Sequence, residues 1–339
     1  MGIGLDQTTL DATDLQTADM EIQDAGVDWG ESNQWYWQNL SCHWRVLGNE
    51  GNRPLVLLHG FGASSGHWRH NAAALAASGF RVYGLDLIGF GASAQPGVER
   101  QRPLDNLLWG KQLAAFLEQI VDVRRWGKAV LIGNSLGGLT ALTTAALRPE
   151  LVAAVVAAPL PDPAFIQPLD LQQPEWWCQL KSFFLRLFFH LLPLELIVPL
   201  ITHTGLLRAA LQVAYNSNIQ ADKELLRLIA RPAQRPTAAR SLRAMSIGMT
   251  LRPLEATAPA LLDRLTNNPN RPALLLLWGQ KDRLVPLTIG KHVEKQYPWS
   301  SLSVIEKSGH CPHDESANEF HQAILPWLDR NLEIDRQWA

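Results

Sequence analysis

Short continuous apolar runs alternate with helical segments along the first half of this 339-residue chain. Such runs are typical of strands that are buried on both faces of a sheet. We expect strands at residues 41–47, 54–60, 81–87, 128–133 and 151–158, and helices at 67–78, 104–121 and 135–147. Because strands and helices alternate, the sequence predicts an α/β fold with a mostly parallel sheet and helices on both faces.

The alternation breaks at Pro159 and resumes with expected strands at 273–278 and 302–306 and a closing helix at 318–332. The 112 residues between, 159–270, have a mostly helical pattern. We interpret them as an inserted helical cap over the carboxyl ends of the strands, where α/β sheets place their sites. The predicted core then consists of residues 32–158 and 271–339.

Charge is balanced over the whole chain but not along it. The chain has 30 Lys and Arg against 32 Asp and Glu, with 47% apolar residues, which excludes global disorder and a basic nucleic-acid binder. Residues 1–31 carry eight acids and no Lys or Arg. This stretch lacks the features of signal and transit peptides, so we predict a disordered acidic arm.

The three cysteines, Cys42, Cys178 and Cys311, are too few for a disulfide framework and lack zinc-binding spacing. We therefore expect a reducing compartment such as the cytoplasm rather than secretion. No run of about 18 apolar residues predicts a membrane span. We expect no metal ion, no organic cofactor and no nucleic-acid partner.

Residues 133–137 read Gly-Asn-Ser-Leu-Gly, a G-x-S-x-G motif between an expected buried strand and an expected helix. This context is typical of a nucleophile elbow, in which a strained turn lifts the Ser hydroxyl to the N-terminus of the helix. Ser135 is therefore the candidate nucleophile. The alternative is a glycine-rich turn in which Ser135 is an ordinary N-cap residue.

A Ser hydroxyl needs a base, and sites of this kind place the acid and then the His after the Ser along the chain. Asp282 follows the expected strand 273–278, and His310 follows the expected strand 302–306. We predict Ser135, Asp282 and His310 as the catalytic triad. His313 is the rival base, and Asp162 is the rival acid, although its Pro-Asp-Pro setting favours a turn.

An oxyanion hole needs two backbone N–H donors, and we assign them to Leu136 and Phe61. His59, beside Phe61, is expected to hold the loop backbone through hydrogen bonds. Asp86 is expected to organise a turn, and Cys311 to be a packed small residue rather than a second nucleophile.

The chain resembles the α/β-hydrolase superfamily over about residues 40–332, through five motifs in the same order: HGFGASSGHWR, LDLIGFGAS, GNSLGG, WGQKD and SGHCPHDE. Within it, GNSLGG, GHCPHDE and HGFGASSGHW resemble the pheophytinase and chlorophyll dephytylase branch of chloroplasts and cyanobacteria. That resemblance implies Ser135 as nucleophile, Asp282 as acid and His310 as base, in an enzyme that cleaves the phytyl ester of chlorophyll pigments. The cap, from LPDPAF onward, follows no cap pattern that matches a known specificity.

Residues 176–200 of the cap are apolar on nearly every face, and we name them as candidate substrate-binding residues. The default interpretation is a buried helix; the alternative is a lid that contacts a long prenyl or acyl chain or rests in a membrane interface. Residues 225–254 contain six Arg and no acid. This pattern is typical of a solvated face, or of attraction to an anionic membrane surface. The resemblance to the dephytylase branch implies that such a membrane is a photosynthetic one and that the compartment is of the stromal type.

The sequence therefore predicts a serine ester hydrolase that works through an acyl-enzyme on a hydrophobic carboxylic ester. The leading substrate is the phytyl ester of chlorophyll or pheophytin. A generic carboxylesterase or lipase, another Ser-triad hydrolase such as a carbon–carbon bond hydrolase, and a non-catalytic pigment-binding scaffold are the alternatives. A Ser at position 135 argues against epoxide hydrolases and haloalkane dehalogenases, which use an Asp nucleophile.

Overall fold

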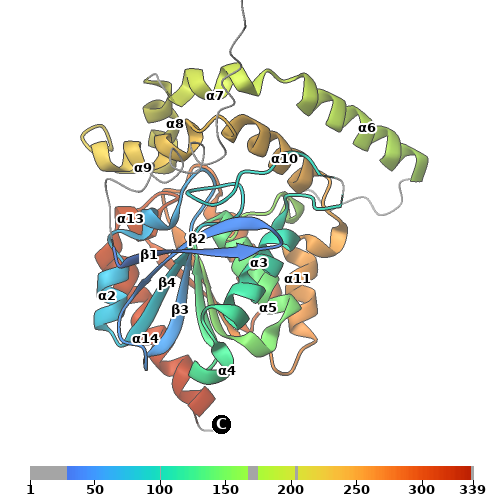
Figure 1. The fold of residues 1–339 in the computed structure, drawn as a ribbon. Coiled ribbons are helices and arrows are strands. Elements are labelled where there is room, and N and C mark those ends of the chain that lie inside the picture. Colours follow the sequence, from blue (N-terminus) through green and yellow to red (C-terminus); the bar gives the residue numbers. More distant parts are fainter. Residues whose placement is uncertain (1–28, 100, 167–174, 203–204, 337–339) are drawn as a thin grey trace, which may run out of the picture.

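The computed structural model describes residues 29–99, 101–166, 175–202 and 205–336. Its centre is one eight-stranded sheet with the order β1-β2-β4-β3-β5-β6-β7-β8 (Figure 1). Neighbouring strands from β4 to β8 run parallel, whereas β2 is antiparallel to both β1 and β4. The strands are β1 Glu31–Trp37, β2 Leu40–Leu47, β3 Arg53–Leu58, β4 Phe80–Leu85, β5 Ala129–Gly133, β6 Val152–Ala157, β7 Ala273–Gly279 and β8 Ser300–Ile305. The predicted α/β fold with a mostly parallel sheet is confirmed.

Helices cover both faces of this sheet. On one face lie α3 Asn106–Gln119, α5 Leu136–Leu147, α11 Ala258–Thr266 and α12 Leu287–Gln296. On the other lie α2 Ala72–Ala77 and α14 Ala317–Arg336. The short elements are α4 Val123–Trp126, α13 Pro312–Glu315, and the 3-10 helices η1 Ser65–Trp68, η2 Pro149–Leu151, η3 Pro163–Phe165 and η4 Leu254–Ala256.

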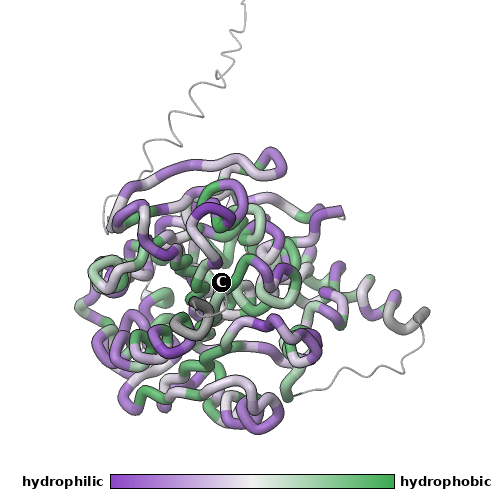
Figure 2. Tube along the Cα trace, turned by 90° about the horizontal axis from the view of Figure 1, so that it is seen from below, coloured by the Kyte–Doolittle hydropathy of each residue, from purple (hydrophilic) through white to green (hydrophobic). Residues whose placement is uncertain are grey.

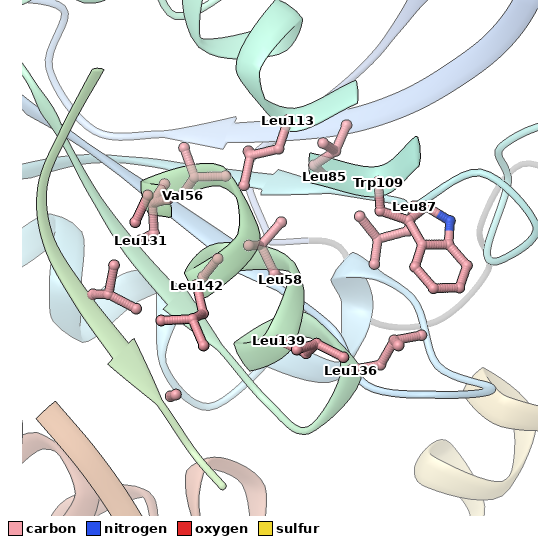
Figure 3. Packing of buried hydrophobic residues seen from close by; sticks show 14 of the residues in the cluster. Val56, Leu58, Leu85, Leu87, Trp109, Leu113, Leu131, Leu136, Leu139 and Leu142 are labelled. Atoms are coloured by element: carbon pink, nitrogen blue, oxygen red, sulfur yellow. The ribbon is translucent and has the colours of Figure 1, made fainter. Parts of the chain in front are cut away.

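The two layers follow from side-chain alternation along the central strands. In β3, Val56 and Leu58 pack toward α3 and α5, while Leu55 and Leu57 pack toward α2 and α14, and all four side chains are fully buried. Continuous apolar runs are what such doubly covered strands require. Figure 3 shows Leu139 and Leu142 of α5 among the side chains of the first layer, and in Figure 2 apolar segments concentrate toward the centre of the molecule.

Five helices lie over the ends of the strands, at the top of Figure 1. They are α6 Glu175–Leu191, α7 Leu194–Thr202, α8 Leu206–Ala214, α9 Lys223–Ala233 and α10 Ala238–Thr250. The predicted boundary of the cap at residue 270 is wrong, because α11 packs on α5 and buries Leu261, Leu262 and Leu265 in the core beside the sheet. The helices over the strand ends therefore finish at residue 250.

Other differences concern the first half of the chain. Strand β1 was not predicted; it is an edge strand in which only Trp35 and Trp37 are buried. Trp29 is also buried, so the folded part begins before residue 32; the rest of the predicted acidic arm, residues 1–28, lies outside the described residues. The predicted helix 67–78 is split into η1 and α2. Trp68, the last residue of η1, is buried, and Arg69 in the turn between the two helices donates to Asp314.

In the described part of the chain, no single helix is long and apolar enough to cross a membrane. Gln179–Leu191 and Leu194–Thr202 together reach that length and composition, but the pair is bent by 54°.

Candidate active site

Ser135 lies in a strained turn between β5 and α5. Its φ is +52° and its ψ is −114°, a backbone conformation that residues with a side chain rarely adopt. The turn is tight: a Cβ atom on Gly137 would lie 2.2 Å from the carbonyl oxygen of Leu58. Ser135 makes no side-chain capping hydrogen bond and is half-buried, so the alternative of an ordinary N-cap is wrong.

His310 and Asp282 meet as the sequence predicts. His310 Nδ1 lies 2.9 Å from Asp282 Oδ2, and the side chains are 10% and 0% exposed. Asp282 Oδ1 also accepts hydrogen bonds from the backbone N–H groups of Leu284 and Val285, at 2.8 and 2.9 Å. A carboxylate held this way keeps the proton of the imidazole on Nδ1, so Nε2 presents a lone pair.

Asn134 connects the Ser turn with the His loop, and the sequence analysis did not single it out. Its Nδ2 donates to the carbonyl oxygens of His310 at 3.0 Å and Ala158 at 2.6 Å. The backbone N–H of His310 in turn donates to Ala214, at the end of α8, at 2.7 Å. Asn134 is 2% exposed. A polar residue inside a buried strand–turn segment was the available signal, because a buried amide needs partners.

The loop that carries Phe61 lies directly beside Ser135. A Cβ atom on Gly60 would lie 3.5 Å from Cβ of Ser135 and 2.6 Å from Oδ1 of Asn134. In the described chain, the backbone N–H groups of Phe61 and Leu136 donate to no protein acceptor. The Phe61 side chain is 62% exposed. Both N–H groups therefore stay available to a ligand at the N-terminus of α5.

His59 holds this loop from below, as predicted. Its Nδ1 lies 2.8 Å from the carbonyl oxygen of Gly60, and its Nε2 accepts from the backbone N–H of Leu87 at 3.0 Å. Burial lowers the pKa of His59, although Asp86 opposes the shift. The neutral His59 ring therefore holds the loop in place through these two hydrogen bonds.

The rival residues have structural roles. Asp162 caps η3 through Ala164, accepts from the backbone N–H of Ala258 at 2.7 Å and pairs with Arg252 at 2.7 Å. His313 is fully buried, with its ring 4.2 Å from that of Trp68, and burial lowers its pKa far below the usual range. The prediction of a turn at Asp162 is confirmed.

Cys311 is buried beside His310, and burial raises the pKa of its thiol. A nucleophilic cysteine needs a lowered thiol pKa, so the environment fits the predicted packing role. Among the described residues, no group of three or more His, Cys, Asp or Glu side chains is arranged to hold a metal ion.

The structure also contains a second Ser–His–Asp array that the sequence analysis missed. Ser32 Oγ lies 2.7 Å from His43 Nε2, and His43 Nδ1 lies 3.0 Å from Asp86 Oδ2. Asp86 also accepts from the backbone N–H groups of Ser65 at 2.6 Å and Ala92 at 2.9 Å, which confirms its predicted role in organising a turn. Burial would lower the pKa of His43, but Asp86 outweighs it and raises that pKa.

Two hollows lie near the helices above the sheet. One of about 360 Å³ borders the second array and is lined by His43, Asp86 and four arginines. The other, of about 800 Å³, lies between the end of α7, α8 and α9. Neither is lined by Ser135, Asp282 or His310.

Comparison with known proteins identifies the family. The profile of the family described as alpha/beta hydrolase fold matches residues 53–317, more than half of the chain. The chain belongs to this family. This alpha/beta hydrolase is 27% identical over 292 residues to the pimeloyl-[acyl-carrier protein] methyl ester esterase of Aliivibrio salmonicida, a match that covers 84% of this chain and 97% of the relative.

Two further similarities are to a curated hydrolase and to an esterase of known structure. A 2-hydroxy-6-oxononadienedioate/2-hydroxy-6-oxononatrienedioate hydrolase of Burkholderia vietnamiensis is 27% identical, with 86% of this chain and 92% of the relative covered. A thermophilic esterase from Thermogutta terrifontis superposes with a TM-score of 0.62 at 20% identity, with 89% and 99% of the two chains covered, and shows the fold alone. Two other curated relatives match only locally, and the chain spans 28% and 36% of their lengths.

Proposed function

We propose that this alpha/beta hydrolase cleaves carboxylic esters with Ser135 as its nucleophile. The observation that carries the proposal is the strained Ser135 turn, joined through Asn134 to a loop whose His310 is paired with a buried carboxylate. A hydroxyl at a helix N-terminus, a base and its orienting acid are the three parts that acyl transfer requires.

The proposed reaction has two halves. Oγ of Ser135 attacks the ester carbonyl carbon while Nε2 of His310 takes the hydroxyl proton, and Asp282 stabilises the imidazolium that forms. The N–H groups of Phe61 and Leu136 hold the oxyanion. The C–O bond to the alcohol breaks, His310 gives the alcohol its proton, and an acyl-enzyme remains. Water, deprotonated by His310, then attacks the acyl carbon and releases the carboxylic acid and Ser135.

For the substrate, we favour a carboxylic ester without a phytyl group as the working assumption. The relatives reported above include a methyl ester esterase, and none carries a name that refers to chlorophyll. The two hollows beside the upper helices are not lined by the triad, so they lend no support to a long prenyl tunnel. The phytyl ester stays a hypothesis that rests on the motif resemblance and on the apolar character of the cap.

Two assays on the wild-type protein test this proposal. A fluorophosphonate probe should label Ser135, as located by peptide mass spectrometry, and a panel of p-nitrophenyl acyl esters of increasing chain length should be turned over. Labelling at another residue would refute the nucleophile. Labelling of Ser135 without turnover of any ester would favour the ligand-binding scaffold. Incubation with chlorophyll a and pheophytin a should release no free phytol; phytol release would restore the dephytylase hypothesis.

A further inference from the structure

Helix α6 carries an apolar stripe that faces away from the protein. Its six members recur at intervals of three and four residues, the spacing of one helix face, and are between 40% and 72% exposed: Leu180, Phe183, Phe184, Leu187, Phe188 and Leu191. Such a stripe normally packs into a core. The default interpretation of residues 176–200 as a buried helix is therefore wrong for this stripe, and in Figure 1 α6 extends beyond the edge of the layers beneath it.

The exposed stripe continues onto α7, whose other face is already packed. Leu194 and Val198 of α7 are buried against Ala238 and Ala239 of α10. Leu196 and Leu200, on the opposite side of α7, are 73% and 58% exposed. We call the six stripe residues together with Leu196 and Leu200 the α6–α7 face. Since α7 already packs on α10 through its opposite side, the exposed residues of this face contribute little to that packing.

This face holds much of the exposed apolar surface of the molecule. Of the 17 large apolar side chains that are exposed in the described residues, 11 lie between Ile166 and Val213. Contiguous apolar surface of this kind marks an interaction site, whereas single exposed apolar residues are ordinary.

The surroundings of the face are positively charged. Residues 176–254 contain ten Lys and Arg but only three acids. Each of these acids is paired in the structure: Glu195 with Arg243, and Asp222 and Glu224 with Arg69. Arg208, Arg227 and Arg231, which line the 800 Å³ hollow next to α7, have no carboxylate partner among the described residues. Among the described residues, these three arginines therefore carry positive charge that no carboxylate compensates.

We infer that the α6–α7 face docks onto a phospholipid bilayer with anionic headgroups. Phenylalanine and leucine side chains enter the boundary between headgroups and acyl chains, and Arg208, Arg227 and Arg231 contact the lipid phosphates. A second copy of the chain fits less well, because a two-fold interface would bring this basic surface against itself. The inference is independent of the chemistry at Ser135, since it concerns binding and not turnover.

Vesicle co-sedimentation of the full-length protein tests the inference. The wild type should bind phosphatidylcholine vesicles with 30% phosphatidylglycerol about tenfold more strongly than pure phosphatidylcholine, and added salt should weaken the binding. Changing Phe183, Phe184 and Phe188 together to Ser should lower the partition coefficient at least about tenfold. The matched control, Tyr36→Ser with Val304→Ser, removes exposed apolar side chains elsewhere and should bind like the wild type.

The role of the arginines is tested with a second double variant and a matched control. Arg227→Glu with Arg231→Glu, one turn apart on α9, should weaken binding to the anionic vesicles about tenfold. Lys291→Glu with Lys295→Glu, one turn apart on α12, should leave it unchanged.

Hydrolysis of a short soluble ester, or circular dichroism if none is hydrolysed, checks that each variant is folded. No vesicle binding by the wild type, or equal binding by the Phe and control variants, would overturn the inference. So would light scattering that shows a wild-type dimer which the Phe variant loses, because a second copy would then cover the face.

Discussion

The predicted triad and the second array each contain a His–Asp pair with a similar hydrogen-bond length, but the surroundings of the two pairs differ. Among the described residues no hydrogen bond joins Ser135 to His310, whereas Ser32 Oγ lies 2.7 Å from His43 Nε2. In both pairs, His Nδ1 lies about 3 Å from a buried Asp carboxylate, at 2.9 Å for His310 and 3.0 Å for His43. Ser135 sits at positive φ before the N-terminus of α5, whereas Ser32 lies in the regular ladder of β1, opposite Arg45.

The hydrogen bonds of the two histidines differ as well. Both ring nitrogens of His43 have partners, Ser32 and Asp86. Nε2 of His310 makes no hydrogen bond within the described chain. The two His–Asp pairs therefore differ in their surroundings: among the described residues, His310 keeps a free imidazole nitrogen, and Ser135 lies in a strained turn beside backbone N–H groups that have no protein acceptor.

The largest contrast should appear when each serine is removed. Ser135→Ala should lower kcat for a p-nitrophenyl ester by about 10⁴-fold or more, since the nucleophile is lost and only binding and oxyanion contacts remain. Ser32→Ala should change kcat by less than about twofold, because Ser32 lies in the regular ladder of β1 and not in a strained turn at a helix N-terminus. Steady-state kinetics with thermal melts measures both. A loss of activity in Ser32→Ala at unchanged stability would make the second array catalytic.

Substitutions of the two carboxylates, Asp282 and Asp86, should have different effects: the first should lower activity and the second should lower stability. Asp282→Asn should leave the fold intact and lower kcat about 10⁴-fold, because the imidazole is then held in the wrong tautomer. Asp86→Ala should cost about 3 kcal/mol of unfolding free energy, because it removes the acceptor of two backbone N–H groups and the partner of buried His43. Urea denaturation of both variants gives the numbers. Equal stabilities would contradict the structural role assigned to Asp86.

The fold and the strained turn at Ser135 could be predicted because they depend on local patterns. Leu55 to Leu58 form an unbroken apolar run that only a doubly covered strand satisfies, and the G-x-S-x-G motif needs its strand–turn–helix setting. The second array joins Ser32, His43 and Asp86 across three strands or strand ends, and β1 carries too little apolar character to be recognised as a strand.

The cap was harder to predict for a different reason. An apolar stripe at helical spacing gives the same sequence pattern whether the fold buries it or leaves it exposed. The sequence of residues 176–200 therefore could not decide between a buried helix and an exposed lid. The predicted end of the cap at residue 270 is wrong because α11 has the same helical sequence pattern as the cap helices before it, yet it packs on α5 in the core.

A smaller effect is expected at the residue that connects the catalytic loops. Asn134→Ala leaves the carbonyl oxygens of His310 and Ala158 without this donor, which should cost about 1–3 kcal/mol of unfolding free energy. Because His310 is then held less firmly, kcat should fall about tenfold with little change in KM. Asn106→Ala, which removes a buried amide on α3 away from the triad, should lose stability without the kcat effect.

The smallest expected effect is the pH dependence of stability that the second array contributes. Asp86 raises the pKa of His43 above 6.5, so His43 stabilises the fold below pH 6.5, and this contribution is lost as pH rises through the folded-state pKa. The pKa of Asp86, despite its burial, is lowered by His43 from 3.8, so its contribution is lost only as pH falls below about 4.

The stability difference between wild type and His43→Gln should therefore be largest between about pH 4 and 6.5 and should narrow toward pH 9. Ser32→Ala keeps the His43–Asp86 pair and should retain the pH dependence of the wild type. Urea unfolding at pH 5, 7 and 9 measures these differences. A stability difference that is constant across this pH range would mean that His43 acts in the fold as a neutral hydrogen-bonding side chain. The charge of the His43–Asp86 pair would then contribute nothing to the free energy of unfolding.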